Sequence, residues 1–134
     1  MTGVDEREVQ HDIETPPAIQ VRFGIEFVAA SLADATVVMS IPMAGLRNPF
    51  TGAPAVGPLA ILVGPAAGMV NHYRRCIDRW TVSSELSLDV SPDITDAIQD
   101  GAAPVVASAS AVGAVGTTPL AVCALTCADT VIGT

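Results

Sequence analysis

The chain has 134 residues and a formal net charge of −8, from 14 acidic and six basic side chains. This length is enough for one domain with a buried core. Half of the residues are hydrophobic but only 4% are aromatic, so an aliphatic core is expected. Nucleic-acid binding needs Lys and Arg to neutralise phosphates, so the acidic balance argues against nucleic acid as a partner.

The first 15 residues are acidic and lack an apolar period. We interpret them as a disordered arm or a fraying helix. Two prolines end this segment, which predicts an arm over residues 1–17 and a single domain over residues 18–134. No basic stretch followed by an apolar one opens the chain, so no secretory signal is expected.

Five further segments are rich in β-branched or alternating apolar residues and are predicted to be strands. They are residues 25–31, 35–42, 80–90, 104–115 and 117–129. The connecting segments are predicted as a short helix or turn over 18–23, a loop over 43–55 and a turn-like stretch over 91–101.

The segment around which the chain is organised runs from Ala53 to Cys76 and is predicted to be mainly a helix. It carries no charge from Val56 to Val70. A helix that is apolar all round must be buried all round, so we expect a sheet wrapped around it. Its polar tail, residues 71–75, is expected to reach solvent, where arginines suit the negative end of the helix dipole.

The predicted helix begins with Gly57 as a tolerable N-cap and Pro58 in the first helical position. Pro65 lies seven positions further on, where it removes a backbone donor and clashes with the carbonyl of Ile61. We therefore expect a kink or a break there. The 18 residues from Ala53 to Val70 carry no charge and reach the lower length limit for a membrane span, but six Gly and Pro residues interrupt them, so no membrane span is expected.

The three cysteines, Cys76, Cys123 and Cys127, show neither a CxxC pair nor a Cys/His cluster with metal-ligand spacing. No metal site is therefore expected. Free, buried thiols suit a reducing compartment, which predicts a cytoplasmic protein.

The predicted order of two strands, a buried helix and three longer strands resembles a known family. The matching positions are Asn48, Gly52, residues 56–60, Thr81-Val82 leading to residues 86–88, Ser91-Pro92 and a final strand pair that ends at Asp129. Over about residues 23–134 the chain resembles the PaaI-like, phenylacetate-pathway branch of the hotdog acyl-CoA thioesterases. The resemblance implies an α+β hotdog fold, a five- to six-stranded antiparallel sheet wrapped around one long central helix. It also implies a homodimer or homotetramer, an acyl-CoA or similar thioester ligand and no cofactor.

In that family the helix begins with Asn, a short gap and His-Gly-Gly, and an Asp or Glu follows seven residues after the second Gly. The resemblance implies that the first Gly N–H polarises the thioester carbonyl and that the carboxylate acts as base or nucleophile. Here Gly57 holds the first Gly position, while Val56 replaces the His, Pro58 the second Gly and Pro65 the carboxylate. No Asp or Glu lies on the predicted helix.

Each candidate residue also has a purely structural interpretation. Gly57 is either an oxyanion donor or a helix N-cap. Asn48 positions a water or the carbonyl, or it forms an Asx turn before Pro49; its gap to the helix is two residues longer than the family pattern. Glu85 replaces the missing carboxylate, or it is simply solvated on its strand.

Ser83 and Ser84 either hold a water or belong to an exposed strand face. Arg74 and Arg75, with Arg79 nearby, either bind coenzyme A phosphates or form a charged helix end in solvent.

Two hypotheses follow. The first is hydrolysis of a small or medium acyl-CoA thioester at a dimer-interface site. The alternative is a non-catalytic hotdog module that binds acyl-CoA or another apolar ligand, or that acts as an assembly partner. A dehydratase is disfavoured because the Asp/His pair of such enzymes is absent from the loop before the helix.

Overall fold

The computed structural model describes residues 6–74, 86–101, 103–113, 120–128 and 130–134. The elements in chain order are α1 (Glu6–Glu14), α2 (Ala18–Arg22), β1 (Glu26–Ser31), β2 (Thr36–Ile41), the 3-10 helix η1 (Met43–Leu46), α3 (Pro58–Tyr73), α4 (Ile94–Asp100), β3 (Val105–Val112), β4 (Leu120–Cys127) and β5 (Thr130–Gly133). The five strands form one sheet in the order β1-β2-β3-β4-β5. Every neighbouring pair is antiparallel.

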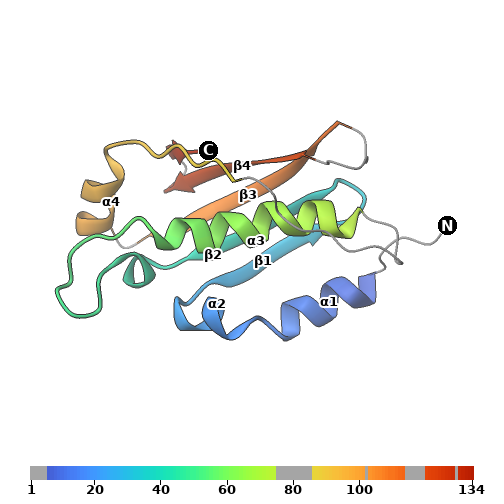
Figure 1. Cartoon of the computed structure of the whole chain (residues 1–134), viewed down its shortest axis with the longest axis horizontal. Coiled ribbons are helices and arrows are strands. Elements are labelled where there is room, and N and C mark those ends of the chain that lie inside the picture. Colours follow the sequence, from blue (N-terminus) through green and yellow to red (C-terminus); the bar gives the residue numbers. More distant parts are fainter. Residues whose placement is uncertain (1–5, 75–85, 102, 114–119, 129) are drawn as a thin grey trace.

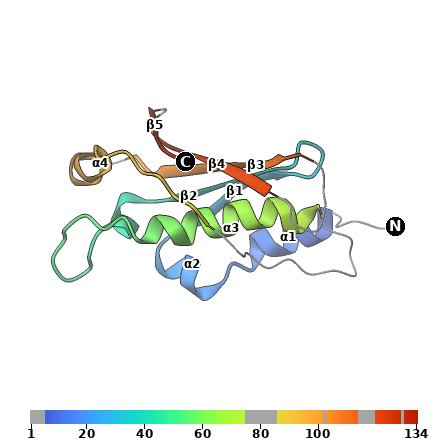
Figure 2. The same cartoon turned by 45° about the horizontal axis from the view of Figure 1, so that its top comes forward.

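The sheet and α3 form the two layers of the molecule. Figure 1 shows α3 running along the sheet, and its contacts are chiefly with β2, β3 and β4. Helices α1 and α2 lie on the same side of the sheet as α3 (Figure 2). This arrangement confirms the predicted antiparallel sheet packed on one long central helix.

The core lies between the inner face of the sheet and the buried side of α3. Alternate residues of β2 point inward and are fully buried, namely Val37, Met39 and Ile41. From α3 the fully buried side chains include Leu59, Leu62, Ala66 and Val70. The period of two on the strand and the helical spacing on α3 therefore meet in one aliphatic core.

Of the kink or break predicted at Pro65, the break is wrong, because α3 runs uninterrupted from Pro58 to Tyr73; a kink stays a prediction. An interior proline costs about 3 kcal/mol. Each buried Leu or Val side chain contributes about 1.5–3 kcal/mol, and α3 buries Leu59, Leu62, Val63 and Val70. Burial along the whole helix therefore outweighs the local cost of one proline.

The strand predicted over residues 80–90 is only partly open to comparison, since residues 80–85 lie outside the described part of the chain. Residues 86–89 are not assigned to a strand, which corrects the prediction there. Val90 forms an isolated antiparallel bridge with Gly133. Asp89 and Thr134 exchange two backbone hydrogen bonds of 2.9 Å. The end of the predicted strand thus pairs along the free edge of β5.

The turn-like stretch predicted over residues 91–101 contains α4 instead. Ile94 and Ile98 are both buried. Residues four apart lie on one face of a helix, so these two side chains give an otherwise polar segment an apolar face that packs on the core.

Of the two states predicted for the acidic N-terminal segment, its described part takes the helical one. Val9 of α1 is buried and Ile13 packs against the core. The division into an arm over residues 1–17 and a domain over residues 18–134 stays a prediction. Within the described residues, no helix combines the length and the apolar character that crossing a membrane requires.

Candidate functional site

The N-terminal end of α3 carries an exposed backbone donor at Gly57. The carbonyls of Val56 and Gly57 accept hydrogen bonds of 3.0 Å from the amides of Leu59 and Ala60. The amide of Gly57 itself has no acceptor among the residues that the structure describes. The first amides of a helix point outward without intrahelical partners at the positive end of its dipole. An anionic or carbonyl oxygen is the group that this position suits.

The space beside Gly57 is open. A Cβ atom added at Gly57 would meet no other atom within 4 Å, apart from its chain neighbours. Val56 is exposed and Pro58 is partly exposed, so the donor is flanked by two apolar side chains. The helix start therefore offers one exposed hydrogen-bond donor between two apolar side chains.

Asn48 lies in the loop that leads to α3, and its side chain is used within that loop. Its Oδ1 accepts hydrogen bonds from the amides of Phe50 at 2.8 Å and Thr51 at 3.3 Å. Its backbone N–H donates to the carbonyl of Ala53 at 2.8 Å. This is the Asx turn that was one of its two interpretations. The geometry makes Asn48 a residue that shapes the loop, and its role toward a thioester stays a prediction.

Pro65 is partly exposed near the middle of α3. It lies eight residues beyond Gly57, which is about 12 Å along the helix at about 1.5 Å per residue. The described helix contains no carboxylate between these two positions or beyond them. A group that activates water must therefore come from another element or from a second subunit.

Arg74 ends α3 at the opposite end from Gly57, about 25 Å away along the helix axis. Its Nη2 donates to the carbonyl of Gly113 at 2.7 Å, which ties the helix end to the end of β3. Its Nη1 is buried and has no acceptor among the described residues. The structure therefore does not bring Arg74 together with Gly57, and its predicted contact with coenzyme A phosphates stays a prediction.

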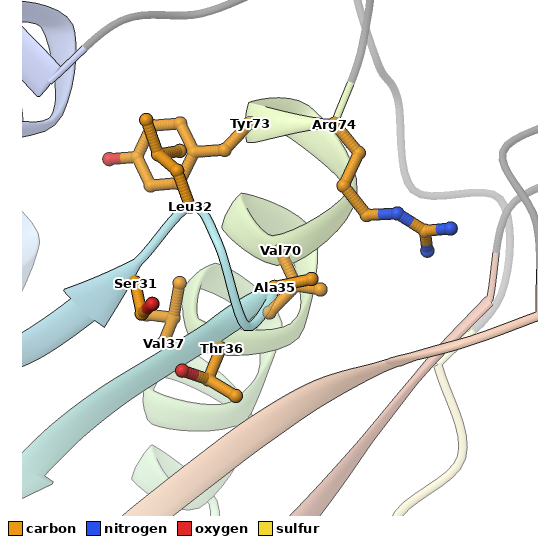
Figure 3. Close-up of a pocket in the computed structure, with 8 residues that line it drawn as sticks. All are labelled: Ser31, Leu32, Ala35, Thr36, Val37, Val70, Tyr73 and Arg74. Carbon is orange, nitrogen blue, oxygen red and sulfur yellow. The ribbon is translucent and has the colours of Figure 1, made fainter.

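A small pocket of about 10 Å³ adjoins this end of α3. Figure 3 shows its lining residues, Ser31, Leu32, Ala35, Thr36, Val37, Val70, Tyr73 and Arg74. About 10–15 Å³ is the room that one water needs, so this pocket is too small for a phosphate. Figure 3 also shows Tyr73 and Arg74 pointing in different directions from the helix end.

Four candidate residues fall outside the described part of the chain, namely Arg75, Ser83, Ser84 and Glu85. Their predicted roles stay predictions. Among the described residues, no three His, Cys, Asp or Glu side chains gather in a way that could hold a metal ion.

Contacts at the C-terminal end of α3 were not found by sequence reasoning. Tyr73 is 7% exposed, so the expectation that the whole tail reaches solvent is wrong for this residue. Its hydroxyl donates to Asp12 Oδ2 at 2.7 Å, and His72 Nε2 lies 3.6 Å from Glu8 Oε1. The sequence did contain a signal for these contacts. Glu8 and Asp12 are four residues apart, so on a helix they share one face.

A second missed contact holds the loop before α3 in place. Arg47 Nη2 donates to the carbonyls of Ile98 at 2.6 Å and Gln99 at 3.3 Å. These carbonyls belong to the last turn of α4, the negative end of that helix. The backbones of Arg47 and Pro54 also form an isolated antiparallel β-bridge across the loop. One arginine thus fixes the loop that positions Gly57.

Comparison with known proteins bears on the fold. No protein-family model and no curated protein matches the sequence. Solved structures do match. The fold is the hotdog fold. The prediction of this α+β fold is confirmed.

Three solved structures illustrate the likeness. A phenylacetic acid degradation-related protein from Ralstonia eutropha JMP134 has a TM-score of 0.72 at 15% identity, over 96% of this chain and 94% of its own. A mutant thioesterase from Pseudomonas aeruginosa has a TM-score of 0.73 at 18% identity, over 98% and 89%. Thioesterase superfamily member 2 from zebra fish has a TM-score of 0.68 at 16% identity, over 97% and 93%. At these identities the likeness is one of fold.

Proposed function

We propose that this protein binds acyl-CoA thioesters with the thioester carbonyl at the N–H of Gly57, and that it hydrolyses them. The observation that carries the proposal is the amide of Gly57 at the start of a 16-residue helix, which faces open space and has no acceptor within the described part of the chain. A preorganised backbone donor of this kind stabilises the oxyanion of acyl transfer, with an effect of about 3–4 kcal/mol in measured cases. The thioesterase names of proteins with this fold support the same reaction class.

We assign a small or medium acyl chain to the apolar groups around the donor. Val56 and Pro58 flank Gly57 with apolar surface, and Pro65 continues it along the helix. None of these side chains offers a charge or a hydrogen bond to the acyl group. The selectivity of this part of the site therefore rests on shape and on apolar contact, which discriminates weakly between homologous chains.

Hydrolysis also needs a group that activates water, and α3 has none. We assign this role to Glu85, with Ser83 and Ser84 as holders of the water, acting at a site between two subunits. The support for Ser83 and Ser84 is the resemblance of the sequence around them to the hotdog thioesterases. Glu85 is assigned because it is an acid on the predicted strand, out of phase with Leu86 and Leu88. Arg74 and Arg75 are assigned to the phosphates of coenzyme A because guanidinium groups bind phosphates bidentately. Asn48 is assigned to the shape of the loop before Gly57.

One observation favours a second candidate function. Pro65 occupies the position at which the resembling thioesterases carry their carboxylate. A chain that keeps the Gly57 donor without that acid retains the means to bind a thioester and lacks the usual means to cleave it. A non-catalytic module that binds acyl-CoA or another apolar ligand is therefore the alternative.

The first test is the release of free thiol from short, long and aromatic acyl-CoA thioesters by the purified protein. Gly57→Ala is expected to lower kcat/KM at least tenfold, since its methyl group enters the open space beside the amide without touching the fold. Gly64→Ala adds a methyl group to the same helix, also into open space, and is expected to leave kcat/KM unchanged.

Glu85→Ala separates the two candidate functions. If Glu85 activates water, kcat falls strongly in this variant while Glu26→Ala, an exposed carboxylate of β1, leaves kcat unchanged. Turnover that survives Glu85→Ala would reject Glu85 as the base. Absence of thiol release from every thioester by the folded wild type, together with saturable binding of one of them, would support the non-catalytic alternative.

A further inference from the structure

Arg47 connects the loop before α3 to the end of α4. Its Nη2 donates to the carbonyls of Ile98 at 2.6 Å and Gln99 at 3.3 Å. The side chain is partly buried, and its Nε is buried without an acceptor among the described residues. A buried donor left without a partner costs about 1–3 kcal/mol. The contact with α4 is therefore made at some expense of stability.

The end of α4 receives its cation from a distant part of the chain. The last turn of α4 contains no basic residue, although a basic side chain there would stabilise the negative end of the helix by a local contact. The guanidinium that meets the last carbonyls belongs instead to a residue 51 positions before Ile98. The contact therefore joins two elements of the fold, where a local cap would stabilise only one.

The helix α4 is a firm support for this contact. Ile98 is fully buried. The amide of Ser91, just before the helix, donates to the carbonyl of Ile132 on β5 at 2.7 Å. A Cβ atom added at Gly101, just after the helix, would lie 3.2 Å from the Cε atom of Met43 in η1. The segment around α4 is thus fixed to the sheet at one end and packed against η1 at the other.

The loop carries this fixed position on to Gly57. Figure 1 shows the loop and α4 at the same end of the molecule. The two arms of the loop are paired, because the amide of Ala55 donates to the carbonyl of Leu46, the residue before Arg47, at 2.7 Å. Gly57 lies two residues after Ala55 and two before Leu59, and both Leu46 and Leu59 are fully buried. The Gly57 amide therefore belongs to a short span that is held at both ends.

We propose that Arg47 is a positioning residue for the thioester site: by tying the loop to α4, it orients the N–H of Gly57 toward the thioester carbonyl. This inference rests on the proposed function. A donor stabilises the oxyanion when it lies about 2.7–3.1 Å from it, and a displacement of about 1 Å costs on the order of 100-fold in rate. Because the oxyanion forms only in the transition state, a displaced donor lowers kcat more than it raises KM.

The main variant is Arg47→Met, which keeps an apolar side chain at this position and loses the hydrogen bonds to α4. In the thiol-release assay its kcat is expected to fall at least tenfold, with KM within about threefold of the wild-type value. Arg47→Lys keeps a positive charge and N–H donors for the carbonyls of α4. It is expected to recover kcat to within about threefold of wild type.

Tyr73→Phe is the control for lost stability. It also removes a long-range hydrogen bond, the one to Asp12, but at the opposite end of α3 from Gly57. Its kcat is expected to equal that of wild type at a temperature at which circular dichroism shows all variants folded. If Arg47→Met does not fold, Arg47→Gln takes its place. Wild-type kcat in the folded Arg47 variant, or an equal fall in Tyr73→Phe, would overturn the inference.

A measurement without ligand separates this inference from the proposed function. In the ¹H–¹⁵N NMR spectrum of the full chain, the Gly57 cross-peak is expected to move in Arg47→Met, to return toward its wild-type position in Arg47→Lys and to stay in place in Tyr73→Phe. A Gly57 cross-peak that Arg47→Met leaves unchanged would overturn the inference, whether or not the chain cleaves thioesters. If the cross-peak moves as expected and the wild type releases no thiol, the proposed hydrolysis fails while the link between Arg47 and Gly57 stands.

Discussion

Replacing Pro65 by Ala tests why α3 stays unbroken. The change restores a backbone N–H in the middle of the helix, where the carbonyl of Ile61 is the intrahelical acceptor, and removes the clash of the ring with that carbonyl. An interior proline is about 3 kcal/mol less favourable than Ala in a helix. Pro65 is only partly buried, so the lost ring contributes less than the roughly 0.8 kcal/mol per methylene of full burial.

The balance is a stabilisation of about 2 kcal/mol, taking the lost contacts of the ring as about 1 kcal/mol. For 134 residues, an unfolding entropy of about 2.1 cal/mol/K per residue gives about 0.28 kcal/mol/K in total. Pro65→Ala should therefore raise Tm by about 7 °C in a calorimetric or circular-dichroism melt.

Gly64→Ala is the control for this experiment, because Gly64 lies in the same turn of α3 and its new Cβ meets nothing within 4 Å besides its chain neighbours and the backbone of its own helix. It should raise Tm by about 3–4 °C, from a helix-propensity gain of about 1 kcal/mol. If Gly64→Ala behaves in this way and Pro65→Ala melts at or below the wild-type Tm, the reasoning about Pro65 is refuted.

Three further outcomes follow from single contacts. Arg47→Met should lower the free energy of unfolding by about 2 kcal/mol in urea, since its charge-assisted hydrogen bonds to the last carbonyls of α4 are lost, while exposed Arg22→Met should leave it unchanged. Tyr73→Phe should cost about 1–2 kcal/mol in the same assay by removing the 2.7 Å hydrogen bond to Asp12; an unchanged midpoint would contradict that bond. Burial raises the pKa of Cys123 from 9.0 to about 11. At pH 8 its alkylation, mapped by mass spectrometry, should be on the order of 100-fold slower than that of a free cysteine, because the thiolate is the nucleophile. The folded thiol also keeps its proton where the unfolded one loses it, so stability should fall as the pH rises from 9.0 to about 11.

The fold could be predicted because short stretches of sequence are enough to indicate its main elements. The hairpin of β1 and β2 and the apolar helix α3 each carry a clear period in the sequence. The prediction failed where long-range packing decides the outcome. Pro65 obeys a local rule that is outweighed by burial along the whole of α3, and α4 forms because Ile94 and Ile98 reach the core.

The candidate site was predictable to a smaller extent. Gly57 was found because the start of a helix is readable from Gly-Pro before an apolar run. The Asx turn of Asn48 is equally local and was among its interpretations. The contacts of Arg47 and Tyr73 join segments more than 50 residues apart in the chain. No local pattern in a single sequence indicates which of two such distant residues will be in contact.

The central claim is that a thioester carbonyl accepts a hydrogen bond from the amide of Gly57. The most direct measurement is the ¹⁵N-resolved NMR shift of the Gly57 amide proton during titration with an acyl-CoA thioester and with the matching alkyl-CoA thioether, which lacks the carbonyl. We expect a downfield shift with the thioester and little or no shift with the thioether. An equal shift with both ligands, or an unchanged Gly57 amide under saturating thioester, would contradict the claim.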